Sequence, residues 1–179
     1  MKRHLIYILS FFTLFAFSCN QGLAPGEEAS GETGFGGTIT FTGNWPASVK
    51  QTYLVLFKDE LHDSTDFIVS NIYFISEEIP FGINQFRYST LENQLDPQLF
   101  GKVPPGEYAY LAVVQSESET IQLIRSAWVV AGVYYSGNDF SAPGKIIVDE
   151  NKFTDNININ VDFSSPPPQP PQKFPPDEK

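Results

Sequence analysis

Thiols, imidazoles and positive charges are scarce in this chain of 179 residues. Its single cysteine excludes a disulfide-stapled scaffold, because one thiol has no partner within the chain. Eleven Lys and Arg stand against 21 Asp and Glu, giving a net charge of -10. Nucleic-acid binding is therefore excluded, since it needs a basic surface to neutralise phosphates. Hydrophobic residues make up 41% of the chain, which is enough to bury the core of one domain.

The first 18 residues match a secretory signal peptide. Lys2 and Arg3 form a short basic stretch, and thirteen mostly apolar residues follow at 5–17. As a helix this run spans only about 20 Å, too short for a hydrocarbon core of about 30 Å. Ala16 and Ser18 provide the small residues that precede a cleavage site. We therefore expect residues 1–18 to be removed and the chain to be exported.

Cys19, the only cysteine, would then become the new N-terminus. The Ser18–Cys19 junction resembles a bacterial lipobox, in which the thiol receives a diacylglyceryl group. Ordinary cleavage at the same bond, which leaves a free thiol, is the alternative. Acyl chains contribute about 0.8 kcal/mol per buried CH₂, so two or three chains hold a domain on a membrane. Asn20 stands where Asp would signal retention in the inner membrane, so the resemblance implies an outer-membrane location.

Two segments without apolar periodicity flank the middle of the chain. Residues 19–36 are rich in Gly, Glu, Ser and Ala, which predicts a flexible tether. Residues 164–179 contain seven prolines, which predicts a disordered spacer, because proline lacks the N–H that a sheet requires. Residues 37–163 are the predicted domain.

This middle segment carries the alternation typical of β-strands. Residues 156–163 place Ile157, Ile159, Val161 and Phe163 on one face, and 38–42 repeat the pattern. Continuous apolar runs at 53–57 and 108–114 predict strands that are covered on both faces. Further strands are predicted at 67–75, 85–91, 121–130 and 145–149, with one helical turn in 95–101. Because Gly- and Pro-rich turns separate them, we expect an all-β fold, a single antiparallel β-sandwich of about 7–8 strands.

Two stretches of the sequence resemble small bacterial surface domains. Residues 101–108, GKVPPGEY, are similar to the approach to a strand that recurs in transthyretin-like and collagen-adhesin B-type sandwiches. Residues 128–135, WVVAGVYY, followed by Pro143 and the alternating strand, resemble transthyretin-like domains of bacteroidete-type surface lipoproteins. The resemblance implies an immunoglobulin-like or transthyretin-like sandwich and, by itself, no particular function.

Groups suited to catalysis are few. Once the leader is removed His62 is the one histidine, and no motif sets an acid and a nucleophile beside it, so we expect no enzymatic activity. The surrounding loop carries Asp59, Asp63 and Asp66, whose oxygens suit Ca²⁺. A solvated acidic turn is the alternative. No other cofactor is expected.

Aromatic residues supply the second candidate site. Trp128, Tyr134, Tyr135 and Phe140 lie near predicted strand ends, where carbohydrate-binding sandwiches stack sugars. Packing in the core or at its rim is the alternative. Two functions stay open. One is a lipid-anchored outer-membrane domain with a structural or accessory role, contacting an envelope protein. The other is a glycan-binding module of an outer-membrane polysaccharide-handling system.

Overall fold

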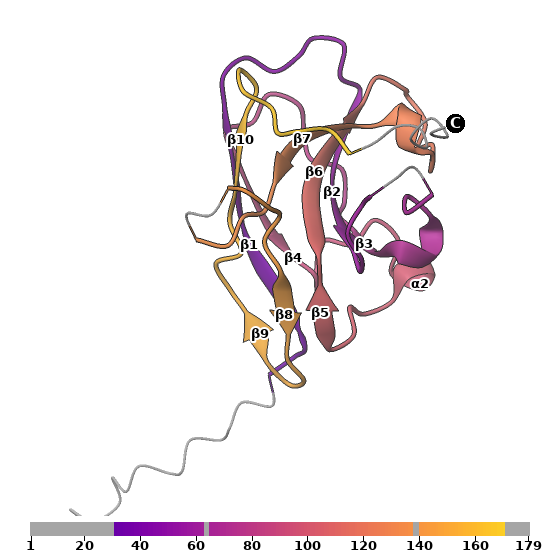
Figure 1. Ribbon diagram of the computed structural model, residues 1–179, viewed down its shortest axis with the longest axis vertical. Helices are drawn as coiled ribbons and strands as arrows, with labels where there is room; N and C mark the ends of the chain where they lie inside the picture. The colour runs from indigo at the N-terminus through magenta and orange to yellow at the C-terminus, as the bar shows by residue number, and fades with distance from the viewer. Residues whose placement is uncertain (1–30, 63–64, 138–139, 171–179) are drawn as a thin grey trace, which may run out of the picture. The chain divides into compact units, whose positions relative to one another are not determined.

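Two four-stranded sheets form the body of the protein (Figure 1). The computed structural model describes residues 31–62, 65–137 and 140–170. In one sheet the strand order is β10 (Ile159–Asp162), β1 (Gly34–Thr42), β4 (Gln85–Ser89), with β9 (Phe153–Thr154) also pairing with β1. In the other it is β3 (Ile72–Ile75), β2 (Gln51–Phe57), β6 (Tyr110–Ser116), β7 (Val129–Val133). A small sheet pairs β5 (Gly106–Tyr108) with β8 (Ile146–Val148). The predicted all-β sandwich class is confirmed.

Most strand pairs are antiparallel, and strand β1 supplies the exceptions. It is antiparallel to β4 but parallel to β9 and β10, with Ile39 opposite Ile159 and Phe41 opposite Val161. A parallel pair cannot be closed by a hairpin, so its strands come from distant parts of the chain. Here the first and last strands of the domain are hydrogen-bonded to each other. The first sheet is therefore complete only when the chain through Asp162 has folded.

The predicted alternation of the closing strand is confirmed. Ile157, Ile159 and Val161 are buried, while Asn158, Asn160 and Asp162 between them are exposed. The apolar face contributes to a core that also contains residues of β2, β6 and β8, so the two sheets pack face to face. The polar face is left on the outside of the sheet. A shift of one residue in register would exchange the two faces.

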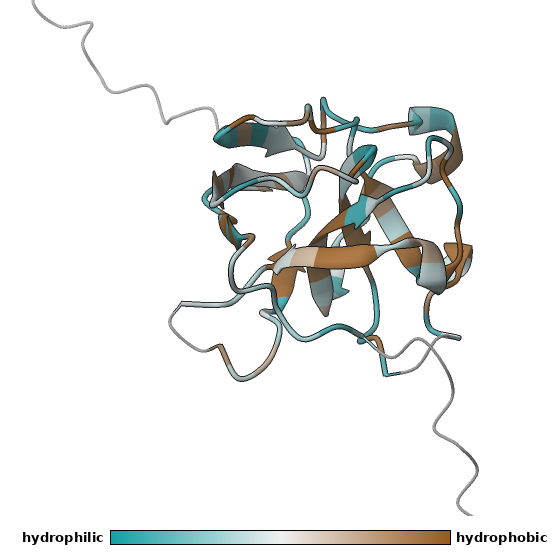
Figure 2. Ribbon diagram, turned by 90° about the horizontal axis from the view of Figure 1, so that it is seen from above, coloured by the Kyte–Doolittle hydropathy of each residue, from teal (hydrophilic) through white to brown (hydrophobic). Residues whose placement is uncertain are grey.

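Strands β2 and β6 are covered on both faces, as their continuous apolar runs predict. Leu54, Leu56 and Leu111 enter the main core between the sheets. Tyr53, Val55 and their neighbours on β6 enter a second apolar cluster on the outer face of the same sheet. Figure 2 shows hydrophobic residues along strands inside the domain and hydrophilic residues along much of the connecting chain. The outer cluster needs a cover, and loops rather than a third sheet provide it.

One predicted strand is instead part of this cover. Residues 121–128 run as irregular chain with a 3₁₀ turn, η2 (Arg125–Ala127), and only β7 continues as strand. Ile121 and Leu123 lie against the outer apolar cluster. Apolar residues that cover a sheet have the same composition as residues within one, so the sequence pattern did not distinguish the two. A second turn, η1 (Val69–Asn71), likewise replaces part of the strand predicted at 67–75.

The boundary predicted for the N-terminal tether was wrong. Strand β1 begins at Gly34, and Phe35 is fully buried. A Cβ atom on Gly36 would lie 2.7 Å from the carbonyl oxygen of Tyr88. Glycine is thus required here for close packing, although its abundance in this segment is also typical of flexible linkers. Residues 1–30, which include the predicted signal peptide, Cys19 and most of the tether, lie outside the described residues.

Disorder was also a wrong prediction for the first part of the C-terminal tail. Residues 164–170, here called the C-terminal strap, leave β10 and cross to β7. The side-chain amide of Gln169 accepts a hydrogen bond from the Val130 N–H and donates one to the Val130 carbonyl, both at 2.8 Å. Prolines cannot make this pair of bonds with their backbone, and Gln169 makes it with its side chain. Residues 171–179 lie outside the described part.

Two short features complete the fold. The helical turn predicted in 95–101 is α2 (Pro97–Phe100), and the Asp96 carboxylate accepts hydrogen bonds from the N–H groups of Gln98 and Leu99. In the GKVPPGEY segment, the Tyr108 hydroxyl donates to the Pro104 carbonyl at 2.7 Å. Burial, with a smaller contribution from Tyr73, raises the pKa of Tyr108 to about 12. Among the described residues, no helix has the length and apolar character to cross a membrane.

The Tyr108 bond provides a test of this turn. We expect Tyr108→Phe to lower the free energy of unfolding by about 0.5–1.5 kcal/mol, the net value of one hydrogen bond. Tyr53→Phe is the control, because the Tyr53 hydroxyl has no hydrogen bond among the described residues. Urea unfolding midpoints measure both. Equal midpoints would show that the Tyr108 hydroxyl does not hold the turn.

Candidate functional site

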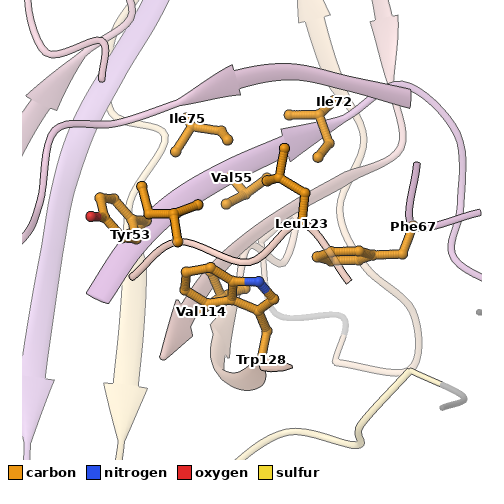
Figure 3. A pocket seen from close by; sticks show the side chains of 9 residues that line it. Tyr53, Val55, Phe67, Ile72, Ile75, Val114, Leu123 and Trp128 are labelled. Atoms are coloured by element: carbon orange, nitrogen blue, oxygen red, sulfur yellow. The ribbon is translucent and has the colours of Figure 1, made fainter. Parts of the chain in front are cut away.

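Trp128, a predicted sugar-stacking residue, is not available as a binding surface. It is 4% exposed and lies in the outer apolar cluster, with its ring 5.8 Å from that of Tyr53. Its indole Nε1 donates to the Gln122 carbonyl. Figure 3 shows Leu123 above the indole and Phe67 beside it. The pocket they enclose holds about 10 Å³, which is room for about one water molecule, so no ligand fits there. The prediction for Trp128 was therefore wrong, because its ring is buried.

Tyr134 and Tyr135 point to opposite sides of the second sheet, as expected for neighbouring residues in extended chain. Tyr134 packs against the main core, and Tyr135 packs against the outer cluster. Tyr135 also contacts Phe140 edge-to-face, with ring centroids 5.3 Å apart. Phe140 is 70% exposed. Of the four predicted aromatic residues, the structure brings Tyr135 and Phe140 together at the surface and places the other two against the cores.

These two rings border an open recess of about 510 Å³, here called the edge recess. It lies where the edge strands of the two sheets, β7 and β10, meet, and the C-terminal strap forms part of its rim. Its polar side comes from the exposed face of β10, and its lining residues are Ala131, Gly132, Val133, Tyr135, Gly137, Phe140, Asn158, Asn160, Asp162 and 165–168. The volume lies within the range of about 300–1,000 Å³ that is typical of small-molecule sites.

The close approach of β7 to β10 depends on Gly132. A Cβ atom at this position would lie 2.7 Å from Cγ2 of Val161 and 3.3 Å from Cγ2 of Ile159. Real Cβ atoms do not make contacts of 2.7 Å with carbon, so a larger residue would push the two edges apart. The recess therefore rests on two strands held in close contact, and both belong to four-stranded sheets.

The polar residues of the recess differ in how they are already bonded. Oδ1 of Asn158 accepts the Thr38 N–H at 2.8 Å, which ties this side chain to β1. Oδ1 of Asp162 accepts the hydroxyl and the N–H of Ser164, and these bonds lower the pKa of the carboxyl group below its usual value. The carboxylate is thus ionised at neutral pH. The Asn160 amide has no side-chain hydrogen bond among the described residues and faces solvent.

A buried asparagine, Asn71, ties the two ends of the acidic loop together. Asn71, which is buried, accepts from the Asp59 N–H and donates to the Asp66 carbonyl, both at 2.9 Å. The Asp66 carboxylate accepts the N–H of His62. Asp63 lies outside the described residues, and the described residues contain no group of three metal-ligating side chains. The Ca²⁺ site predicted from Asp59, Asp63 and Asp66 thus stays a prediction.

The strap also covers a buried guanidinium that the sequence analysis missed. Arg125 is 5% exposed, and it donates to the carbonyls of Trp128 and Pro170. Its Nε has no partner in the described structure. Burial lowers the pKa of Arg125, and the nearby Tyr110 acts in the opposite direction. No local sequence pattern predicts that Arg125 bonds these two carbonyls, because they lie three and 45 residues away along the chain.

Asn160 and Asp162 were the other residues missed, although a signal was present. The alternation in 156–163 that predicts a buried face also predicts an outer face of closely spaced amides and a carboxylate. Their position beside Phe140 depends on the contact between β7 and β10, which no local sequence pattern reveals. Comparisons of the chain with protein-family models, curated proteins and solved structures find no match.

Proposed function

We propose that this protein is a lipid-anchored domain of a bacterial outer membrane with an accessory interaction role and without catalytic activity. The leader and the solitary Cys19 support the anchor. The domain starts at Gly34, so fourteen residues, 20–33, separate Cys19 from β1. Covalent geometry limits their reach to about 50 Å. The domain therefore acts within this distance of the membrane surface.

The main structural support for an interaction role is the edge recess. It combines an exposed ring, Phe140, with polar groups on the outer face of β10. Strand β10 is hydrogen-bonded to β1 within its sheet, so these polar groups are held in fixed positions. Ligand sites are concave and place a few polar groups among apolar ones. The recess has this composition, and its partner would be a component of the envelope within reach of the tether.

Lipidation is tested by detergent partitioning of the full precursor in a Gram-negative host that carries lipoprotein-processing enzymes. We expect the wild-type protein in the detergent phase, because the acyl chains bring apolar area that the domain itself lacks. Cys19→Ala should move to the aqueous phase. Asn20→Ala, which keeps the thiol, is the matched control and should partition like the wild type.

Wild-type protein in the aqueous phase would contradict the anchor. So would a Cys19→Ala variant that still partitions with detergent. Mass spectrometry of the mature N-terminal peptide gives a second readout, because ordinary cleavage leaves an unmodified thiol at the same position. An unmodified Cys19 peptide would establish the free-thiol alternative.

A further inference from the structure

We infer that the edge recess binds a neutral saccharide, with a sugar ring stacked on Phe140 and its hydroxyl groups bonded by Asn160 and Asp162. This inference rests on the proposed interaction role and names its ligand class. It depends on three independent properties of the recess: an available aromatic ring, unused hydrogen-bonding groups, and the sign of its charge.

The aromatic surface is Phe140. A ring that is 70% exposed keeps a face in solvent, and Tyr135 contacts it edge-to-face at 5.3 Å. Tyr135 in turn packs against the outer apolar cluster. Phe140 is thus supported by a second ring that is itself anchored. The C–H groups on one face of a sugar ring match such a surface, which is apolar and flat.

The hydrogen-bonding groups come from β10. Asn160 presents an amide with both donors and an acceptor, and none of them is used among the described residues. The Asp162 carboxylate is held in place by Ser164 through one oxygen, which leaves the other oxygen for a ligand. Neighbouring sugar hydroxyls act as donors and acceptors at once, so an amide beside a carboxylate complements them. Because β10 is paired with β1, little ordering of these backbone positions is needed on binding.

Charge decides between neutral and acidic saccharides. The described lining of the recess contains one carboxylate and no basic residue, and the whole chain carries a net charge of -10. A uronate or sulfated polymer would meet repulsion without a compensating cation. A neutral sugar meets no such penalty.

The test uses the mature chain with Cys19→Ala, so that lipidation and saccharide binding are separated. The probes are neutral hexasaccharides of glucose, mannose, galactose and xylose, with oligogalacturonate as the acidic comparison. We expect at least one neutral probe to bind and to shift the NMR signal of the Asn160 side-chain amide. Phe140→Ala should weaken that binding about tenfold or more, as for a central aromatic contact. Asn160→Ala should weaken it severalfold.

Phe81→Ala is the matched control. Phe81 is also a highly exposed phenylalanine, but it packs on Trp45, with ring centroids 5.3 Å apart, and it does not line the recess. Its removal should leave saccharide affinity unchanged. Three outcomes would overturn the inference: no neutral probe binds at about 10 mM, above the millimolar range of weak affinity; only oligogalacturonate binds; or Phe81→Ala weakens binding as much as Phe140→Ala. If wild-type protein from the lipoprotein-processing host carries no lipid while a neutral sugar still binds, the anchor is overturned and the saccharide inference stands.

Discussion

Ile159→Asp is expected to cost several kcal/mol of folding free energy, a large part of the stability of the domain. Ile159 is 1% exposed and lies opposite Ile39, which is on the inner strand β1 of the first sheet. An aspartate there would place a carboxylate among apolar side chains with no cation to pair with it. Whole domains are stabilised by only about 5–15 kcal/mol, so one such substitution removes a large share. Urea unfolding followed by circular dichroism measures the loss.

Asn158→Asp is the matched control, since it introduces the same side chain one residue away. Asn158 is exposed, and the oxygen that accepts the Thr38 N–H is kept in aspartate. Its cost should stay well below 1 kcal/mol. The contrast depends on the period of two along a strand. Similar midpoints for the two variants would remove the assignment of β10 and of the face that forms the edge recess.

The sequence predicted best what depends on local alternation. Residues 156–163 separate into a buried and an exposed face as expected, and the runs in β2 and β6 are buried on both sides. These patterns arise from backbone geometry within one strand, so they are visible without knowledge of the neighbours. The helical turn predicted in 95–101 is also stabilised locally, because Asp96 caps its first N–H groups and Pro97 begins it.

What failed depends on contacts between distant segments. Residues 121–128 have a strand-like composition but cover the sheet instead of joining it, and Trp128 is buried beneath this cover. Gly34 and Gly36 suggest a linker, yet a Cβ atom at either position would be too close to residues 88–91 of the neighbouring segment. The candidate site likewise combines a feature set by local sequence with one set by contacts between distant segments. Its polar face was visible in the sequence, whereas its position beside Phe140 requires the contact of β7 with β10.

The C-terminal strap is the strongest departure from the sequence prediction, and its removal should have a large effect. Deleting residues 166–179 takes away the Gln169 bonds to Val130 and the Pro170 carbonyl that accepts from Arg125. We expect a loss of about 3–5 kcal/mol, since the two neutral Gln169 bonds contribute about 1 kcal/mol each and the bond from the charged Arg125 contributes about 1.5–3. Deleting only 172–179 is the control, because it keeps the Gln169 bonds and leaves the Pro170 carbonyl within a peptide bond. Urea midpoints compare the two.

Arg125→Met shows whether the guanidinium carries part of this effect. In the full chain the substitution should destabilise, because two carbonyls lose their donor. In the 166–179 deletion it should cost less or even restore stability, since a buried cation left with the Trp128 carbonyl and an unpartnered Nε is replaced by an apolar side chain of similar length. The two changes therefore should not add, with a coupling of about 1–3 kcal/mol. Additive losses would show that the strap does not act through Arg125, whereas a 166–179 deletion as stable as the full chain would show that the strap rests on the domain without stabilising it.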